Sequence, residues 1–462
     1  METATGDCGL GIGKEKVVGR FLAQVHANGG LCRRSLPPAF PRSITRDRCP
    51  TGPALKITLQ GLRFEGKTNH SAASGCREES KSMDFLLPEE VAEDQRRFNA
   101  FLAAYVSPHL SGWYSENAIP GKFFRDMGAN GWLAYQSRNG HTVEQSTLEQ
   151  AVLFERLAEL SPGVAVAALV QVSLGTKGLT LFGSQKQKEI HFGPAVRGET
   201  LICVGNTEPT AGSDVANIAT RAERVEGGWL LNGTKAYVTN GAISDLALIT
   251  AVSDPEESRN RRISMFVVDL SSEGVSRKKL NKQVWIPSDL TRISLKNVFV
   301  PDENILGERG RGLQQVLEIF THSRISISAL TLGTAAGAFE MGLAHARKRE
   351  VFGKKVSEFQ AKSFEAADYF SRIEAARLVL WKTCWLKDQG MDFRLESSMA
   401  KYLTVQIARE VSLWAADLFG AASVIFDHPI HKYPMDAWAS SLGEGTQDVQ
   451  KLVIFREIMK RG

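Results

Sequence analysis

One carboxylate near the end of the chain lies between two glycines, in the order Gly443-Glu444-Gly445-Thr446-Gln447. Glycine lets the backbone approach a ligand closely, so this carboxylate could point into a pocket and accept a proton there. A glutamate just before a helix also serves as a cap or complements the helix dipole. On this motif alone, capping is the better explanation.

Two segments in the middle of the chain could contact a flat or oxygen-rich ligand. Residues 208–214 read Glu-Pro-Thr-Ala-Gly-Ser-Asp, a stiff loop whose free N–H groups could bind oxygens. Tyr237-Val238-Thr239 places an aromatic ring and a hydroxyl on one face of a strand, where the ring could stack on a cofactor. Taken singly, the loop is explained by a turn between strands and the second segment by a cross-strand aromatic pair.

A third segment, at a break between two predicted helices, carries Arg349, Phe352, Gly353 and Gln360. The planar fork of arginine donates two hydrogen bonds at once and therefore suits a diphosphate. The alternative is an ordinary helix C-terminus, where basic side chains complement the dipole and Gly353 forms the turn.

Composition limits the kinds of partner. The chain has 462 residues, 43% apolar, enough for two or three domains, and no run of about 18 apolar residues, so we expect no membrane span and a soluble, cytoplasmic protein. Residues 1–82 hold 13 Lys and Arg against 7 Asp and Glu, while the rest is nearly neutral. The near-neutral charge of residues 83–462, called the body below, argues against nucleic acid as the main partner. The body's two lone cysteines, Cys203 and Cys384, match no metal motif, so no metal is assigned.

Residues 1–82 lack helical or strand periodicity and are rich in proline. Three explanations stay open: a disordered tail, a targeting peptide that would send the protein to the mitochondrial matrix, or translated upstream DNA with Met83 as the true start.

The periodicity of the body changes twice. It is helical from residue 89 to about 181, becomes short strands between 201 and 300, and is helical again over 313–350, 358–388, 395–419 and 444–460. Asn232-Gly233 predicts a hairpin turn between two of the strands. The order predicts a mainly α protein with a β domain: helices in 83–202, strands in 203–312 and an antiparallel four-helix bundle in 313–462.

Taken together, in this order and spacing, the segments resemble the acyl-CoA dehydrogenase family over residues 83–462, including the opening Met83-Asp84-Phe85-Leu86-Leu87-Pro88. The resemblance implies an N-terminal helical domain, a middle β-barrel-like domain and a C-terminal four-helix bundle. It also implies a homo-oligomer, a tetramer or a dimer, with FAD bound non-covalently between the β domain, the bundle and a neighbouring subunit.

The resemblance assigns roles by matching motifs. It makes Glu444 the catalytic base, and some relatives place their base instead at the position of Ser323, which cannot do that work. The substrate-binding positions are Ser213, Arg324 and Gly445. The FAD-binding positions are Thr207, Ser213, Tyr237, Val238, Thr239, Arg349, Phe352, Gln360, Gly420, Thr446 and Gln447.

The implied reaction is α,β-dehydrogenation of an acyl thioester. Glu444 removes the α-proton, flavin N5 takes the β-hydride, and an electron-transfer flavoprotein or oxygen reoxidises the flavin. The sequence departs from the family pattern at Thr210, Ile286, Gly420-Ala421-Ala422-Ser423 and Met435-Asp436-Ala437. These departures leave open an acyl group on a carrier protein as the substrate, a flavin monooxygenase on the same fold, and a non-catalytic flavin-binding protein.

Overall fold

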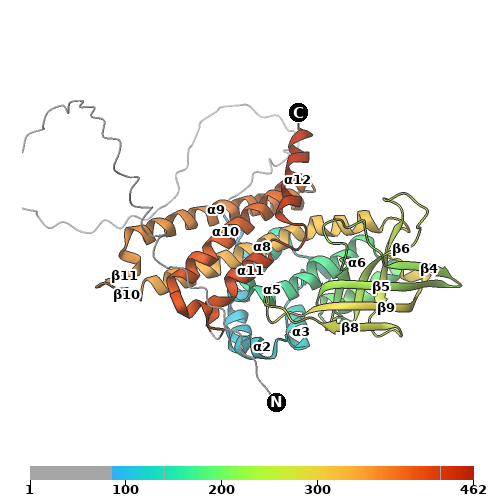
Figure 1. Ribbon diagram of the computed structural model, residues 1–462, viewed down its shortest axis with the longest axis horizontal. Helices are drawn as coiled ribbons and strands as arrows, with labels where there is room; N and C mark the ends of the chain where they lie inside the picture. Colours follow the sequence, from blue (N-terminus) through green and yellow to red (C-terminus); the bar gives the residue numbers. More distant parts are fainter. Residues whose placement is uncertain (1–85, 139–140, 427, 462) are drawn as a thin grey trace, which may run out of the picture. The chain divides into compact units, whose positions relative to one another are not determined.

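The computed structural model describes residues 86–138, 141–426 and 428–461, and the alternative explanations of residues 1–82 lie outside this part of the chain. Figure 1 shows helices first, then a twisted sheet, then long helices that end the chain. The predicted order of helices, strands and helices is therefore confirmed.

The N-terminal helices begin at polar or proline residues. Ser146 caps one helix by accepting a hydrogen bond from Glu149 N, and Ser184 forms a capping box with Gln187. Pro162 occupies the first turn of another helix, where its missing N–H costs nothing. The helices are α1 (Glu89–Phe101), α2 (Leu110–Glu116), α3 (Gly121–Ala129), α4 (Thr147–Leu160), α5 (Pro162–Leu169), α6 (Lys177–Phe182) and α7 (Gln185–Val196), with a π-helical segment at Val170–Thr176.

This helical region also contains a short hairpin that the sequence did not predict. Strands β1 (Tyr135–Arg138) and β2 (His141–Glu144) pair antiparallel, with Tyr135 opposite Glu144. Four-residue strands give too little alternation of polar and apolar residues to be recognised by periodicity.

The middle of the chain forms a seven-stranded sheet in the order β3-β6-β4-β5-β9-β8, with β7 paired to β6. Most neighbours are antiparallel, while β3 and β4 run parallel to β6. Trp229 and Phe266 lie in the core of this sheet. The strands are β3 (Ile202–Gly205), β4 (Arg221–Val225), β5 (Gly228–Thr239), β6 (Leu246–Val252), β7 (Ile263–Asp269), β8 (Val275–Lys279) and β9 (Leu290–Pro301).

The predicted hairpin turn at Asn232-Gly233 is wrong. These residues lie inside the continuous strand β5, at a bulge opposite β9. A Cβ on Gly233 would come 2.4 Å from Thr220 Oγ1, so the glycine here allows a close approach of two segments. The turn between β4 and β5 is made instead by the two residues before Gly228, with Gly227 at φ 73°.

Four long helices follow the sheet, close to the predicted ranges: α8 (Gly312–Ala346), α9 (Gln360–Asp388), α10 (Arg394–Phe419) and α12 (Gln447–Met459). The short helix α11 (Lys432–Ala439) and the two-stranded turn of β10 (Glu350–Val351) and β11 (Lys354–Lys355) were not predicted. Side chains of α8 and α10 share one hydrophobic core with those of α4 and α5, so the N-terminal helices and the bundle stabilise each other.

Two helical stretches, Pro162–Phe182 and Gly312–Ala346, are long and apolar enough to cross a membrane by length and composition. However, 83% and 72% of their most apolar windows are buried inside the protein. Their place in the core accounts for that composition, because a helix surrounded by other elements is apolar on every side.

Candidate functional site

Glu444 lies in a short loop between α11 and α12, and the loop holds it in an unusual conformation. Its φ is 47°, a left-handed value that costs free energy in a residue other than glycine. Thr446, not Glu444, caps α12, since its hydroxyl accepts a hydrogen bond from Val449 N. The explanation of Glu444 as a helix cap is therefore wrong, and its carboxylate does not cap α12.

The Glu444 carboxylate faces two buried cations. Burial raises its pKa above the ordinary value, and the charges of Lys401 and Arg324 oppose that rise. Within the described ranges, no hydrogen bond or ion pair within 4 Å engages the carboxylate oxygens. A partly buried carboxylate that is unengaged and raised in pKa has the properties of a general base.

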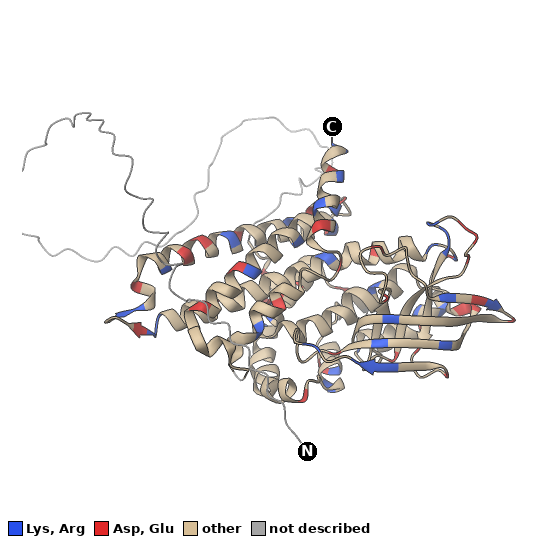
Figure 2. Cartoon of the chain, viewed as in Figure 1, with Lys and Arg blue, Asp and Glu red and all other residues tan. Residues whose placement is uncertain are grey.

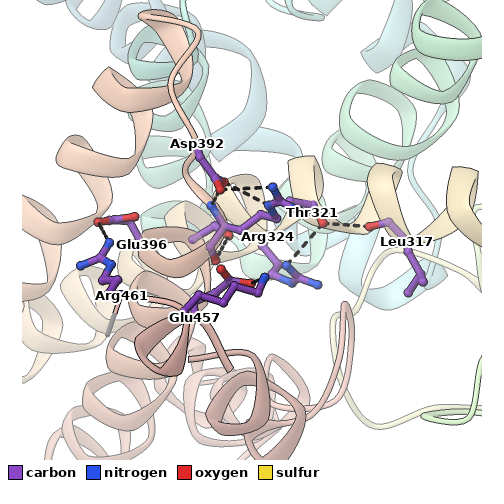
Figure 3. A network of polar contacts seen from close by, with 10 residues as sticks. Leu317, Thr321, Arg324, Asp392, Glu396, Glu457 and Arg461 are labelled. Atoms are coloured by element: carbon purple, nitrogen blue, oxygen red, sulfur yellow. Dashed lines mark hydrogen bonds and ion pairs between the residues drawn. The ribbon is translucent and has the colours of Figure 1, made fainter. Parts of the chain in front are cut away.

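Arg324 comes from the buried face of α8 and is 7% exposed. Figure 3 shows Arg324 joined to Thr321, with 3.5 Å between Nη1 and Oγ1, and Thr321 bonded to the Leu317 carbonyl one turn earlier. The buried Nε of Arg324 has no hydrogen-bond partner in the described structure. A guanidinium with an unused donor beside the base suits an oxygen of a bound ligand.

Ser323, the neighbour of Arg324, is fully buried, and its hydroxyl donates to the Phe320 carbonyl at 3.3 Å. A hydroxyl tied to its own helix in this way supplies no acid or base.

An ion pair fixes the loop at residues 207–214. Glu208 Oε1 lies 2.7 Å from Lys235 Nζ, and both side chains are at most 4% exposed. The carboxylate also accepts hydrogen bonds from the N–H groups of Ala219 and Thr220. Glu208 is thus structural, and it leaves Ser213 exposed and Thr207 half-buried.

Tyr237 and Thr239 lie at the end of β5, beside this loop, because Ala236 N donates to the Thr207 carbonyl at 2.8 Å. Tyr237 is 62% exposed with φ 56°, whereas Val238 is 2% exposed and packs in the sheet core. The ring and the partly exposed Thr239 hydroxyl are therefore available to a ligand, but Val238 could contact one only through its backbone.

The other predicted FAD positions lie at the opposite end of the bundle. Arg349, Phe352 and Gln360 follow α8 and begin α9, and Gly420 ends α10 near the end of α8, where Phe419 stacks on His345. At about 1.5 Å per residue, the helix from Arg324 to the end of α8 is about 33 Å long. One chain therefore does not bring these residues to Glu444, and all four are exposed.

The residues present suit a flavin dinucleotide. An exposed aromatic ring and hydroxyls at the end of β5 can bind a flat polar ring, and Arg349 can bind a diphosphate. Beside Glu444, the buried Oε1 of Gln447 has no hydrogen-bond partner within the described part of the chain. A Cβ on Gly212, Gly353 or Gly420 would meet nothing within 4 Å, so space for a ligand exists at each loop.

Lys401 contacts the loop that carries Glu444, and the sequence did not predict it as a site residue. It is fully buried in α10 and donates hydrogen bonds to the carbonyls of Gly443 and Gly445, on both sides of Glu444. The signal was present, because Ser397, Lys401, Thr404 and Ala408 follow helical spacing along a buried stripe. A lysine at such a position needs a partner inside the protein.

Comparison with known proteins agrees with this geometry. Models of the three acyl-CoA dehydrogenase domains match the chain: the N-terminal domain at residues 88–199, the middle domain at 203–298 and the C-terminal domain at 310–459. The probable acyl-CoA dehydrogenase YngJ of Bacillus subtilis is 30% identical over 385 residues, covering 82% of this chain and all of the relative. Benzylmalonyl-CoA dehydrogenase of Aromatoleum aromaticum is also 30% identical, over 81% of this chain and 100% of its own.

Solved structures show the same fold. Butyryl-CoA dehydrogenase from Megasphaera elsdenii matches with a TM-score of 0.78 and 28% identity, over 82% of this chain and all of that chain. PigA, solved with FAD and proline, matches with a TM-score of 0.78 and 26% identity, over the same shares. The chain is therefore a member of the acyl-CoA dehydrogenase family, an FAD-dependent oxidoreductase acting on CH–CH groups.

Proposed function

We propose that this protein oxidises the Cα–Cβ bond of an acyl thioester, with Glu444 as the base that removes the α-proton. The single observation that carries the proposal is the state of the Glu444 carboxylate. It is buried enough to have a raised pKa, faces Arg324 and Lys401, and is unengaged by other groups in the described structure. A structural carboxylate would be tied to a donor, as that of Glu208 is.

The chemistry needs such a base, because the α-C–H of a thioester is a weak acid. Removal of the proton becomes feasible when donors stabilise the charge that develops on the thioester oxygen. Arg324, whose charge interacts with that of Glu444, offers an unused buried Nε donor. The proton bonds to the Glu444 carboxylate, the Cα–Cβ double bond forms, and Cβ loses a hydride.

FAD accepts that hydride when it is bound. In this chain, Thr207, Ser213, Tyr237 and Thr239 would contact the flavin ring, and Thr446 and Gln447 the rest of the dinucleotide. We infer that Arg349, Phe352, Gln360 and Gly420 serve the site of a second copy of the chain in a homo-oligomer, because they lie at the far end of the same bundle.

The test is anaerobic bleaching of the FAD-loaded protein with a panel of acyl-CoA thioesters, from short straight chains to dicarboxylic ones. We expect at least one thioester to bleach the flavin and Glu444→Gln to slow that step about 100- to 10,000-fold, since that is the usual contribution of a general base. Flavin absorbance before mixing confirms that the variant still binds FAD. Equal rates in the two proteins would reject Glu444 as the base.

A second candidate is oxidation of an aminoacyl group on a carrier protein. The structural similarity to PigA, solved with FAD and proline, favours it, as do the side chains of Ala421 and Ser423, which stand where the family pattern has glycines. Prolyl and other aminoacyl thioesters of a carrier protein, added to the same panel, distinguish the two. Bleaching by these compounds but not by acyl-CoA would select the second candidate.

The reduced flavin needs an acceptor. We propose an electron-transfer flavoprotein, because a solved structure with a TM-score of 0.78 to this chain was reported in work on the electron transferring flavoprotein of Acidaminococcus fermentans. Reoxidation that is fast with such a flavoprotein and slow in air would support this acceptor over oxygen.

A further inference from the structure

Lys401 lies where a lysine is costly. Its side chain is fully buried in α10, on the helix face that also buries the small residues Ser397 and Thr404. Removing an ammonium group from water is unfavourable unless it is hydrogen-bonded or paired with an opposite charge. Two of its three donors reach the carbonyls of Gly443 and Gly445, so its hydrogen bonds go to the loop that carries Glu444.

That loop needs support. Glu444 has φ 47° and Gly445 φ 90°, two successive residues in the left-handed region. Lys401 bonds the carbonyls on both sides of Glu444, while Gln450 Nε2 donates to the Glu444 carbonyl at 3.1 Å and the Gly445 carbonyl at 2.9 Å. The two buried side chains therefore satisfy three consecutive carbonyls and fix the direction of the Glu444 side chain.

Lys401 also acts on Glu444 through its charge. Burial lowers the pKa of Lys401 to about 8, Glu444 opposes that change, and Arg324 adds to it.

Other charged groups on the elements around α10 are engaged elsewhere. Figure 3 shows Glu396 bonded to Arg461, and Glu396 is also paired with Lys382 of α9. On α11, Asp436 accepts a hydrogen bond from Trp285 N, and on α12 Asp448 is paired with Lys451 and Glu457 with Lys460. Glu444 and Arg324 are thus the charged groups that act on Lys401.

We propose that Lys401 is the positioning residue of the catalytic carboxylate: it holds the Glu444 loop in its left-handed conformation and keeps the carboxylate ionised. The proposal rests on the proposed role of Glu444 as the base. Lys401 donates hydrogen bonds to two backbone carbonyls. In the described structure, its Nζ does not approach the Glu444 carboxylate within the 4 Å of an ion pair. A direct pair would weaken the base, whereas a cation held slightly farther away favours ionisation without occupying the oxygens.

The test titrates Glu444 directly. Protonated carboxyl groups give an infrared band in the FAD-loaded protein. The part of this band that is missing from Glu444→Gln belongs to Glu444, and its change with pH reports the ionisation of Glu444 without any turnover. We expect Lys401→Met and Lys401→Gln to move its midpoint upward by about one pH unit, the size of effect that a nearby opposite charge produces. The acid limb of the rate of flavin reduction should move by the same amount.

Lys432→Met is the matched control. Lys432 is also a buried lysine with a pKa lowered by burial to about 8, and it donates to the Leu160 carbonyl, but its charged neighbour is Asp436. It should leave the Glu444 midpoint unchanged. An unchanged Glu444 midpoint in the Lys401 variants would overturn the proposal. If Lys401→Met does not fold, Lys401→Gln, which keeps a hydrogen-bond donor, provides the test. Failure of every thioester to bleach the flavin would reject the proposed function but leave this titration readable.

Discussion

At the scale of single residues, the proposed site consists of one base and two cations that tune it. Glu444 was found from the sequence because it lies between glycines and matches a family signature. Lys401 was not found, because a lysine inside a helical pattern is usually read as surface. Its partners are backbone carbonyls of a loop more than 40 residues later, and only the fold brings them together.

The raised pKa of Glu444 predicts opposite effects of pH on rate and on stability. Flavin reduction requires the ionised form, so the rate should fall as the pH drops through a midpoint above the ordinary glutamate value of 4.5. The folded state holds this proton more tightly than the unfolded state does. The stability contribution of Glu444 is therefore complete below pH 4.5 and is lost as the pH rises through the folded pKa.

Stopped-flow reduction and urea unfolding, each measured as a function of pH, check both trends. Glu444→Gln removes the titrating group and is the control. The unfolding free energy of the unsubstituted protein minus that of Glu444→Gln should fall as the pH rises through the folded pKa of Glu444. A difference that is flat with pH would show that Glu444 titrates at its ordinary value.

At the scale of elements, β5 links the sheet to the site. Its buried Lys235 pairs with Glu208 and so fixes the loop at residues 207–214, which carries Ser213. Glu208→Gln would leave a buried ammonium without its counter-charge, a change that usually costs about 3–5 kcal/mol. We expect a loss of this size in urea unfolding.

Glu223→Gln on the neighbouring strand β4 is the control for this prediction. Glu223 is exposed, so its replacement should change the unfolding free energy by less than about 0.5 kcal/mol. Similar losses in the two variants would mean that the Glu208–Lys235 pair does not stabilise the loop.

Elements were predictable where the pattern was long. The four bundle helices have 13 to 35 residues and were located within a few residues by helical periodicity. The turn predicted from the Asn232-Gly233 dipeptide alone is wrong. This dipeptide lies at a bulge inside β5, because packing against Thr220 requires a glycine there. The short elements β1, β2 and α11 carry too few residues for a pattern to emerge.

At the scale of the whole molecule, the predicted site residues separate into two groups at opposite ends of the bundle. Figure 2 shows positive and negative residues interspersed over helices and strands. Many large apolar side chains of the bundle remain exposed, including Phe364 at 67% on α9 and Phe455 at 62% on α12. We expect these side chains to be covered by another copy of the chain if the proposed homo-oligomer forms.

Phe352 tests that arrangement. It is 96% exposed at φ 51°, so its ring is hardly covered by the part of the chain that the structure describes. Phe352→Asp should leave the fold intact but weaken FAD retention and association, because the side chain is proposed to complete the site of a second copy. Flavin absorbance and mass after gel filtration measure both effects.

Ile190→Asp on α7, also an exposed apolar residue at 53%, is the control and should retain FAD as the parent does. Full FAD retention by Phe352→Asp would contradict the shared site.

Exchange of the α-hydrogen of a thioester in D₂O tests whether Glu444 removes the α-proton. A 3-thiaacyl-CoA has sulfur in place of Cβ, so it can lose an α-proton but cannot give up a hydride. Mass spectrometry of the ligand should show deuterium incorporated by the FAD-loaded protein and incorporated at least about 100-fold more slowly by Glu444→Gln. Exchange at the same rate with both proteins would reject Glu444 as the base, because another group would then be removing the proton.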